Sequence, residues 1–112
     1  MTIYLTRDAV ASSDDLLEYR FIVPSGTTLA EVLQIVLAQL YLATIAGSKA
    51  TWVAQLHKKP VAVLAQQWQQ PVLLSNQLPL LPDATGIVRL HFRYYAQQDP
   101  EEVLARLRLG PV

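Results

Sequence analysis

The sequence predicts an α+β domain in which one long amphipathic helix packs across a mixed sheet and a short helix follows at the C-terminus. Two runs near the N-terminus alternate apolar and polar side chains with the two-residue period of half-buried strands. Apolar residues at helical spacing come next, and the two-residue period then returns in later runs. With 112 residues and no cysteine, the chain has the length of one domain that forms its core without disulfides.

The two N-terminal runs, 3–6 and 17–23, predict an antiparallel hairpin with a polar turn at 11–15. In the first run, Ile3 and Leu5 alternate with Tyr4 and Thr6. In the second run, Leu17, Tyr19, Phe21 and Val23 share one face, and Glu18, Arg20 and Ile22 share the other. Each run therefore has one face for the core and one for the outside.

The next segment predicts an amphipathic helix that begins after Thr28 and stops at Gly47. Thr28 and Glu31 have the spacing of a capping box. The apolar stripe comprises Leu29, Val32, Leu33, Val36, Leu37, Leu40 and Tyr41, and Ile35 and Leu42 widen it. The window 29–47 is apolar enough to raise a membrane span as an alternative. Its polar residues and the absence of a basic flank favour a buried helix.

A second hairpin is predicted from the runs 51–56 and 60–65, with Trp52 in the core. Pro60 indicates a strand start or an edge position. The connection 66–86 has no sustained period beyond a short strand at 71–74, and its Trp68 either caps the core or is an exposed anchor. The last run, 87–95, places Val88, Leu90, Phe92 and Tyr94 on one face, and Arg89, His91, Arg93 and Tyr95 on the other.

Together these segments resemble the ubiquitin-like β-grasp superfamily. The stretches that carry the resemblance are IYLTR, FIVPSGTTLAEVLQIV, WVAQLHKKPVAVL and IVRLHFRYY. The resemblance implies that the last strand lies beside the first, in the middle of the sheet. We therefore expect one domain over 1–112, with a core at 2–95 and a helical extension at 99–110. Another α+β sandwich, with the same helix on a differently ordered sheet, is the alternative.

The C-terminal RLRLGPV is similar to the tail of ubiquitin-like carriers but lacks their terminal pair of glycines. Asp99 is a good N-cap, Pro100 suits the first helical position and Gly110 suits the residue after a helix. The Leu/Arg alternation is therefore expected at the end of a short helix. A carrier or modifier function is disfavoured because the chain ends in Pro-Val.

The inventory of catalytic and ligand-binding groups is small. No cysteine, glycine-rich phosphate loop or nucleophile elbow is present, so we predict no catalytic residues, no metal site and no cofactor. His57 lies in a predicted turn, and His91 is flanked by two arginines. Zero net charge argues against nucleic acid and membrane partners. The N-terminus does not resemble a signal peptide, so the cytoplasm is the expected location.

The sequence predicts a non-enzymatic protein-binding module that acts through the sheet face turned away from the helix. The residues expected there are Arg89, His91, Arg93, Tyr95, Tyr4, Arg20 and Ile22. Arginine and tyrosine are enriched in protein interfaces. Such a module is an adaptor, an accessory subunit or an inhibitor-like binder. An ordinary solvated sheet face and a small-molecule-binding domain are the alternatives.

The composition bears on the same question, because 52% of residues are hydrophobic and only 16% are charged. A small domain needs much polar cover. The surplus apolar surface indicates a partner protein or a second copy of the chain, unless the source simply uses alanine, leucine and glutamine heavily.

Overall fold

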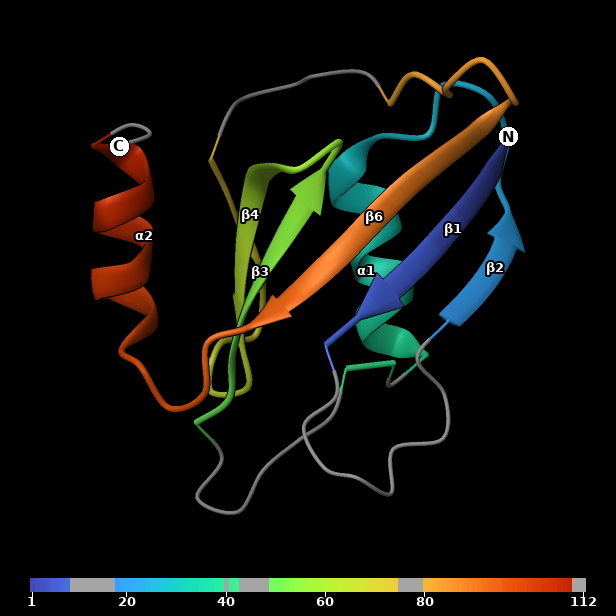
Figure 1. The fold of residues 1–112 in the computed structure, drawn as a ribbon. Coiled ribbons are helices and arrows are strands. Elements are labelled where there is room, and N and C mark those ends of the chain that lie inside the picture. The colour runs from blue at the N-terminus through green and yellow to red at the C-terminus, as the bar shows by residue number, and fades with distance from the viewer. Residues whose placement is uncertain (9–17, 40, 43–48, 75–79, 110–112) are drawn as a thin grey trace.

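The computed structural model describes residues 1–8, 18–39, 41–42, 49–74 and 80–109, and it confirms the predicted α+β class with a mixed sheet (Figure 1). In chain order the elements are β1 Thr2–Arg7, β2 Glu18–Ile22, α1 Leu29–Ala38, β3 Thr51–Leu56, β4 Lys59–Ala65, β5 Val72–Leu73, β6 Ile87–Tyr94 and α2 Pro100–Arg108. The predicted turn at 11–15, the stop at Gly47 and the terminal residues 110–112 lie outside the described residues.

Within the described part of the chain, six strands form one sheet in the order β2-β1-β6-β3-β4-β5. Strand β6 runs parallel to β1 and antiparallel to β3, and every other neighbouring pair is antiparallel. The last strand thus lies beside the first in the middle of the sheet, as the sequence predicted. The short strand expected at 71–74 is β5, which is added at the edge next to β4.

Helix α1 packs against one face of the sheet, behind β6 and β1 in the view of Figure 1. Its start is the predicted capping box, in which the Thr28 hydroxyl accepts from the Glu31 amide and the Glu31 carboxylate accepts from the Thr28 amide. The core between them contains Ile3, Leu5, Val88, Leu90 and Phe92 from the sheet and Leu29, Val32, Leu33 and Val36 from the helix. The predicted periodicities therefore assign the buried faces of these elements correctly.

The prediction of one long helix is wrong, because α1 ends at Ala38 and Gln39 is its C-cap. Tyr41 and Leu42 nevertheless contact the same core. The Tyr41 ring packs edge-on against the ring of Phe92, with 6.0 Å between the ring centres. Burial raises the pKa of the Tyr41 hydroxyl to about 12. The apolar stripe continues past the helix because the chain still covers the core there, and burial alone does not require helical backbone.

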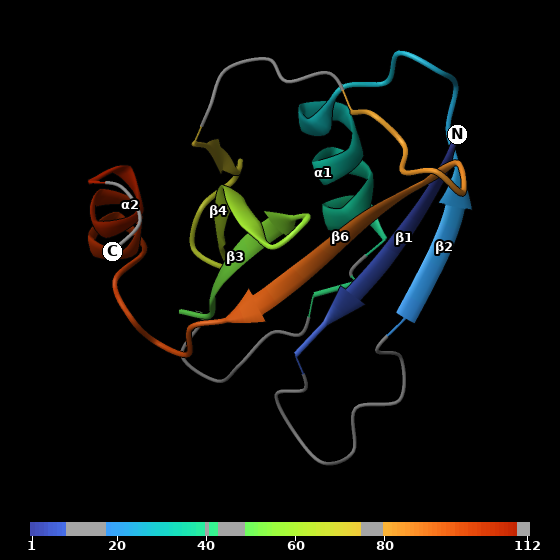
Figure 2. The same ribbon diagram turned by 45° about the horizontal axis from the view of Figure 1, so that its top comes forward.

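Helix α2 confirms the short C-terminal helix and packs on the opposite face of the sheet. Asp99 is its N-cap and Pro100 its first residue. Val103 is buried against Val53 of β3 and Val63 of β4, whose side chains point away from α1. Figure 2 shows α2 beyond β4, on the side away from α1. Helix α2 therefore covers the β3–β4 half of the sheet face that, from the sequence, we expected to be fully exposed.

The two tryptophans lie on different sides of the sheet. Trp52 is 2% exposed in the main core, as predicted. Trp68 is partly buried against the small cluster of Val53, Val63 and Val103. Trp68 thus caps a core from a loop, and the core is the one beneath α2.

None of the helices in the described segments has the length and apolarity needed to cross a bilayer.

Replacing Val103 with alanine tests the docking of α2. Loss of two buried methyl groups from a fully packed site is expected to lower the free energy of unfolding by about 2 kcal/mol. Urea unfolding monitored by tryptophan fluorescence measures the change, and Leu109→Ala, at a side chain that is 88% exposed, is the control. Equal stability of both variants would contradict the packing of α2 on the sheet.

Candidate functional site

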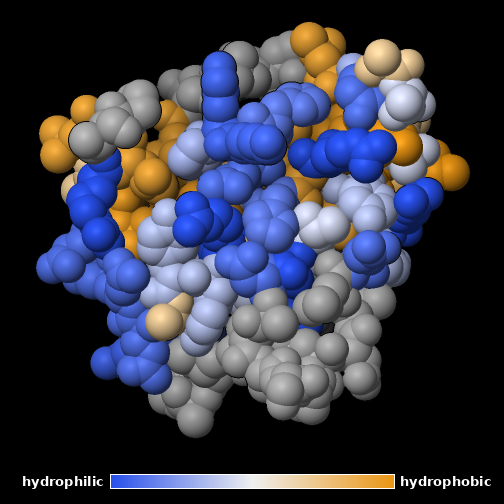
Figure 3. Space-filling model, viewed as in Figure 1, coloured by the Kyte–Doolittle hydropathy of each residue, from blue (hydrophilic) through white to orange (hydrophobic). Residues whose placement is uncertain are grey.

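The surface left uncovered by both helices is the half of the sheet formed by β2, β1 and β6, on the side away from α1. We call this surface the outer face. Hydrophilic side chains gather over it in Figure 3, which is viewed from this side, and hydrophobic ones lie between it and α2. Strand alternation places its residues here, because the neighbouring positions of each strand point into the core.

One cross-strand row dominates the outer face. Tyr4 of β1 pairs with Arg20 of β2 on one side and with Arg89 of β6 on the other. The Arg20 guanidinium carbon lies 4.7 Å from the centre of the Tyr4 ring, and that of Arg89 lies 5.4 Å from it. Both distances are within the range of cation–π attraction. The phenol ring therefore holds two cations close together on one surface.

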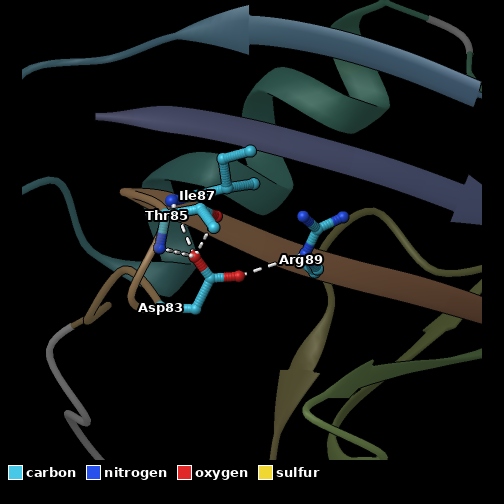
Figure 4. Close-up of polar contacts among 4 residues, drawn as sticks. All are labelled: Asp83, Thr85, Ile87 and Arg89. Carbon is cyan, nitrogen blue, oxygen red and sulfur yellow. Dashed lines mark hydrogen bonds and ion pairs between the residues drawn. The ribbon is translucent and has the colours of Figure 1, made fainter.

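Asp83 fixes Arg89 from the loop that precedes β6 (Figure 4). The Arg89 Nε donates to Asp83 Oδ2 at 3.1 Å, while Asp83 Oδ1 accepts from the amides of Thr85 and Ile87 at 2.8 and 3.2 Å and from the Thr85 hydroxyl. The hydroxyl of Thr85 is the main cause that holds the pKa of this carboxyl well below its ordinary value of 3.8. Gly86 completes the turn with a φ of 79°, which glycine adopts without strain.

The next row contains His91, whose ring is held on both edges. Its Nδ1 lies 2.7 Å from the Thr6 hydroxyl and its Nε2 lies 3.0 Å from Asp8 Oδ1. The other oxygen of Asp8 accepts from the Tyr94 amide at 3.0 Å. A carboxylate only accepts, so Nε2 carries a proton and donates to Asp8, and the Thr6 hydroxyl, which both donates and accepts, holds Nδ1.

The order hydroxyl, imidazole, carboxylate is that of a catalytic triad, but the surroundings of Thr6 differ from those of a nucleophile. Thr6 lies inside β1 and pairs with Glu18 on one side and with His91 on the other. The backbone amides around it point along the sheet toward these strands, so they are not directed at an oxyanion above the face. Thr6 and Asp8 therefore orient the His91 ring.

The β3–β4 turn adds two further basic residues. His57 and Lys58 connect the strands as a two-residue turn, with φ values of 51° and 68°. Hairpin turns with positive φ at both positions favour asparagine and glycine, so the backbone here is unfavourable for these side chains. Both residues are exposed, as the sequence predicted for His57.

Between the turn and the Arg20–Tyr4–Arg89 row lies a depression of about 490 Å³. It is lined by Tyr4, Thr6, Gln55, His57, Lys58, Arg89, Leu90 and His91. The last pair of β3 with β6 is Leu56 with Leu90, so the depression opens where these strands part. We refer to it as the basic depression, because no carboxylate lines it among the described residues.

The structure brings together most of the residues that the sequence proposed for this face. Four of them lie next to one another, namely Arg20, Tyr4, Arg89 and His91. Arg93 follows His91 on the same face of β6 and lies one row closer to α2. Ile22 lies on the edge strand β2 and is 81% exposed. Tyr95 is the exception and a correction. It follows β6, is partly buried and packs against the cluster beneath α2, because α2 folds back over this end of the sheet.

Sequence reasoning missed Asp8, Asp83 and the contribution of the His57–Lys58 turn. Asp8 and Asp83 lie just outside β1 and β6, where alternation no longer assigns a face. No group of three or more histidine, cysteine or acidic side chains with metal-binding geometry occurs among the described residues. Comparison of the chain with protein-family models, with curated proteins and with solved structures yields no match.

Replacing Thr85 with valine tests whether the Thr85 hydroxyl lowers the pKa of Asp83. The variant is expected to raise the pKa of Asp83 toward 3.8, because the hydroxyl hydrogen bond is the largest cause of its depression. A lowered pKa in the folded state means that the carboxylate stabilises the fold above pH 3.8 and that this contribution is lost as the pH falls below that value. A carbonyl-detected NMR titration of Asp83 measures the pKa, and an unchanged value would contradict the assignment.

Replacing Asp8 with alanine tests the link between β1 and β6. The change leaves the Tyr94 amide and one edge of His91 without their acceptor, so the free energy of unfolding is expected to fall by about 1 kcal/mol. Urea unfolding measures it, with the exposed Glu102→Ala on α2 as a control that also removes one carboxylate. No difference between the two variants would refute a role for Asp8 in holding the strands.

Proposed function

We propose that this chain is a non-enzymatic protein-binding module whose outer face binds an acidic segment of a partner protein. The observation that carries the proposal is the Arg20–Tyr4–Arg89 row on a sheet face that neither helix covers. Arginine and tyrosine are the side chains most often found at the energetic centre of protein interfaces. Ile22, two residues from Arg20 on the same face of β2, adds an exposed apolar anchor.

Arg20 and Arg93, the exposed cations of the outer face that have no acidic partner among the described residues, favour an acidic segment, and Glu18 is the exposed acidic residue on the same face of β2. Asp83 and Asp8 already accept hydrogen bonds from Arg89 and His91. Arg20 and Arg93 are exposed and form no ion pair with any described residue. Each instead lies over a tyrosine ring, with Arg93 5.7 Å from the centre of the Tyr95 ring. Stacked guanidinium groups are already oriented, so fewer conformations are lost when they bind carboxylates.

We further propose that the fold is a β-grasp of the ubiquitin-like kind. The strand order β2-β1-β6-β3-β4, with a helix between β2 and β3, supports this assignment. Strand β5 and helix α2 are additions to it, and α2 covers the β3–β4 half of the sheet side that bears the outer face.

The double variant Arg20→Glu with Arg93→Glu tests the proposed function. A protein captured in stoichiometric amount by the tagged wild-type chain, from the cells that produce it, is expected to be reduced at least tenfold by the variant. Two reversed charges at the centre of an interface repel an acidic segment. Quantitative mass spectrometry measures the loss, and circular dichroism checks the fold.

Arg106→Glu with Arg108→Glu is the matched control, because it reverses two exposed arginines on α2 and leaves the outer face intact. The control is expected to retain the partner. Equal capture by both double variants, or capture of no stoichiometric partner by the wild type, would refute the proposed function.

A further inference from the structure

The basic depression has a charge pattern that points to a small anion. Its titratable lining groups are Lys58, Arg89, two imidazoles and one phenol, and no carboxylate of the described residues is among them. The carboxylate of Asp83 accepts from Arg89 Nε on the side of the loop that precedes β6. The two terminal amino groups of the Arg89 guanidinium form no hydrogen bond with any described residue. An anion in the depression would therefore meet cationic donors first.

The lining also has more donors than the protein itself uses. The side chains of Tyr4, Gln55, His57 and Lys58 form no hydrogen bond with the described residues. They come from β1 and from the end of β3 with the turn that follows it, so two segments that are distant in the sequence contribute donors to one space. Because His91 is already held by Thr6 and Asp8, it forms a fixed wall and the free donors surround it.

The shape of the His57–Lys58 turn is a second, independent observation. Lys58 does not suit the positive φ that the turn requires, and asparagine or glycine would form both positions of the turn at lower cost. Unfavourable backbone of this kind is concentrated at ligand-binding sites, where the side chain is needed for contact. Here it places an ammonium group and an imidazole at the rim of the depression.

We propose that the basic depression binds a phosphate monoester. A monoester carries about two negative charges and three acceptor oxygens, which matches Lys58, the Arg89 amino groups and the neutral donors better than the two oxygens of one carboxylate. The volume of about 490 Å³ leaves space for the group that bears the phosphate. The depression shares Tyr4 and Arg89 with the row described above but not Arg20 or Arg93, and its binding of a phosphate does not depend on the proposed function. The phosphate belongs either to a phosphorylated side chain or to a free metabolite.

The experiment is an NMR titration of the isotope-labelled full chain with four probes. They are phenyl phosphate, inorganic phosphate, a neutral peptide with one phosphoserine, and the same peptide with glutamate in that place. Signals of His57, Lys58 and Arg89 are expected to shift with both phosphate monoesters. The glutamate peptide is expected to bind on the order of tenfold more weakly, because it has one charge fewer.

Lys58→Asn is the test variant, since asparagine tolerates the positive φ of the turn and removes the charge. It is expected to weaken monoester binding about tenfold. Lys59→Asn, at the adjacent exposed residue that does not line the depression, is the matched control and is expected to change binding less than twofold. The NMR spectrum without ligand verifies that each variant is folded.

Tighter binding of the phosphopeptide than of phenyl phosphate supports the site and identifies a phosphorylated side chain as the source. The reverse order supports the site and identifies a free metabolite. Absence of shifts with every phosphate probe, equal binding of the glutamate peptide, or equal effects of the two lysine variants would overturn the proposal. None of these results depends on capture of a partner, so the failure of this site and of the proposed function are distinguishable.

Discussion

Strand β6 holds the two halves of this protein together, and the other elements depend on its position. It pairs in parallel with β1 along one edge and antiparallel with β3 along the other, so it provides the strand pairing that connects the hairpin of β1 and β2 to the hairpin of β3 and β4 in the sheet. Its alternation also divides the molecule into two sides. Val88, Leu90 and Phe92 fill the core beneath α1, and Arg89, His91 and Arg93 face outward.

The polar contacts of the outer face follow from the same strand. Asp83 precedes β6 and binds Arg89, and Asp8 follows β1 and binds both His91 and the Tyr94 amide. Acidic residues just outside the strands thus fix basic residues inside them. Arg20 and Arg93, which form no ion pair with the described residues, lie over tyrosine rings instead. A surface ordered before binding has less conformational entropy to lose on contact with a partner. This ordering is the physical basis of our proposal that the outer face binds a partner.

The sequence predicted those strands and helices in which apolar residues recur at a regular spacing, because that spacing indicates which side chains are buried. Alternation in 87–95 identified a strand and its two faces, the resemblance implied its central position, and the Thr28–Glu31 pair located the start of α1. The same logic failed at Tyr41 and Leu42, because buried apolar residues there follow the helix without being helical. It also missed the cover that α2 provides, since a short amphipathic helix does not reveal which sheet face it packs on. The basic depression was beyond prediction because it depends on where β3 and β6 part.

The parallel pairing of β1 with β6 has a consequence for how the chain reaches its fold. Thr6 and His91 are direct neighbours in the sheet although 85 positions separate them along the sequence. Loop closure over so many residues costs entropy before any contact repays it, so proteins rich in such pairs fold slowly. During synthesis β1 leaves the ribosome well before β6. The hairpin of β3 and β4 is local and able to form early, whereas β1 must wait for β6 until all the residues between them have been made.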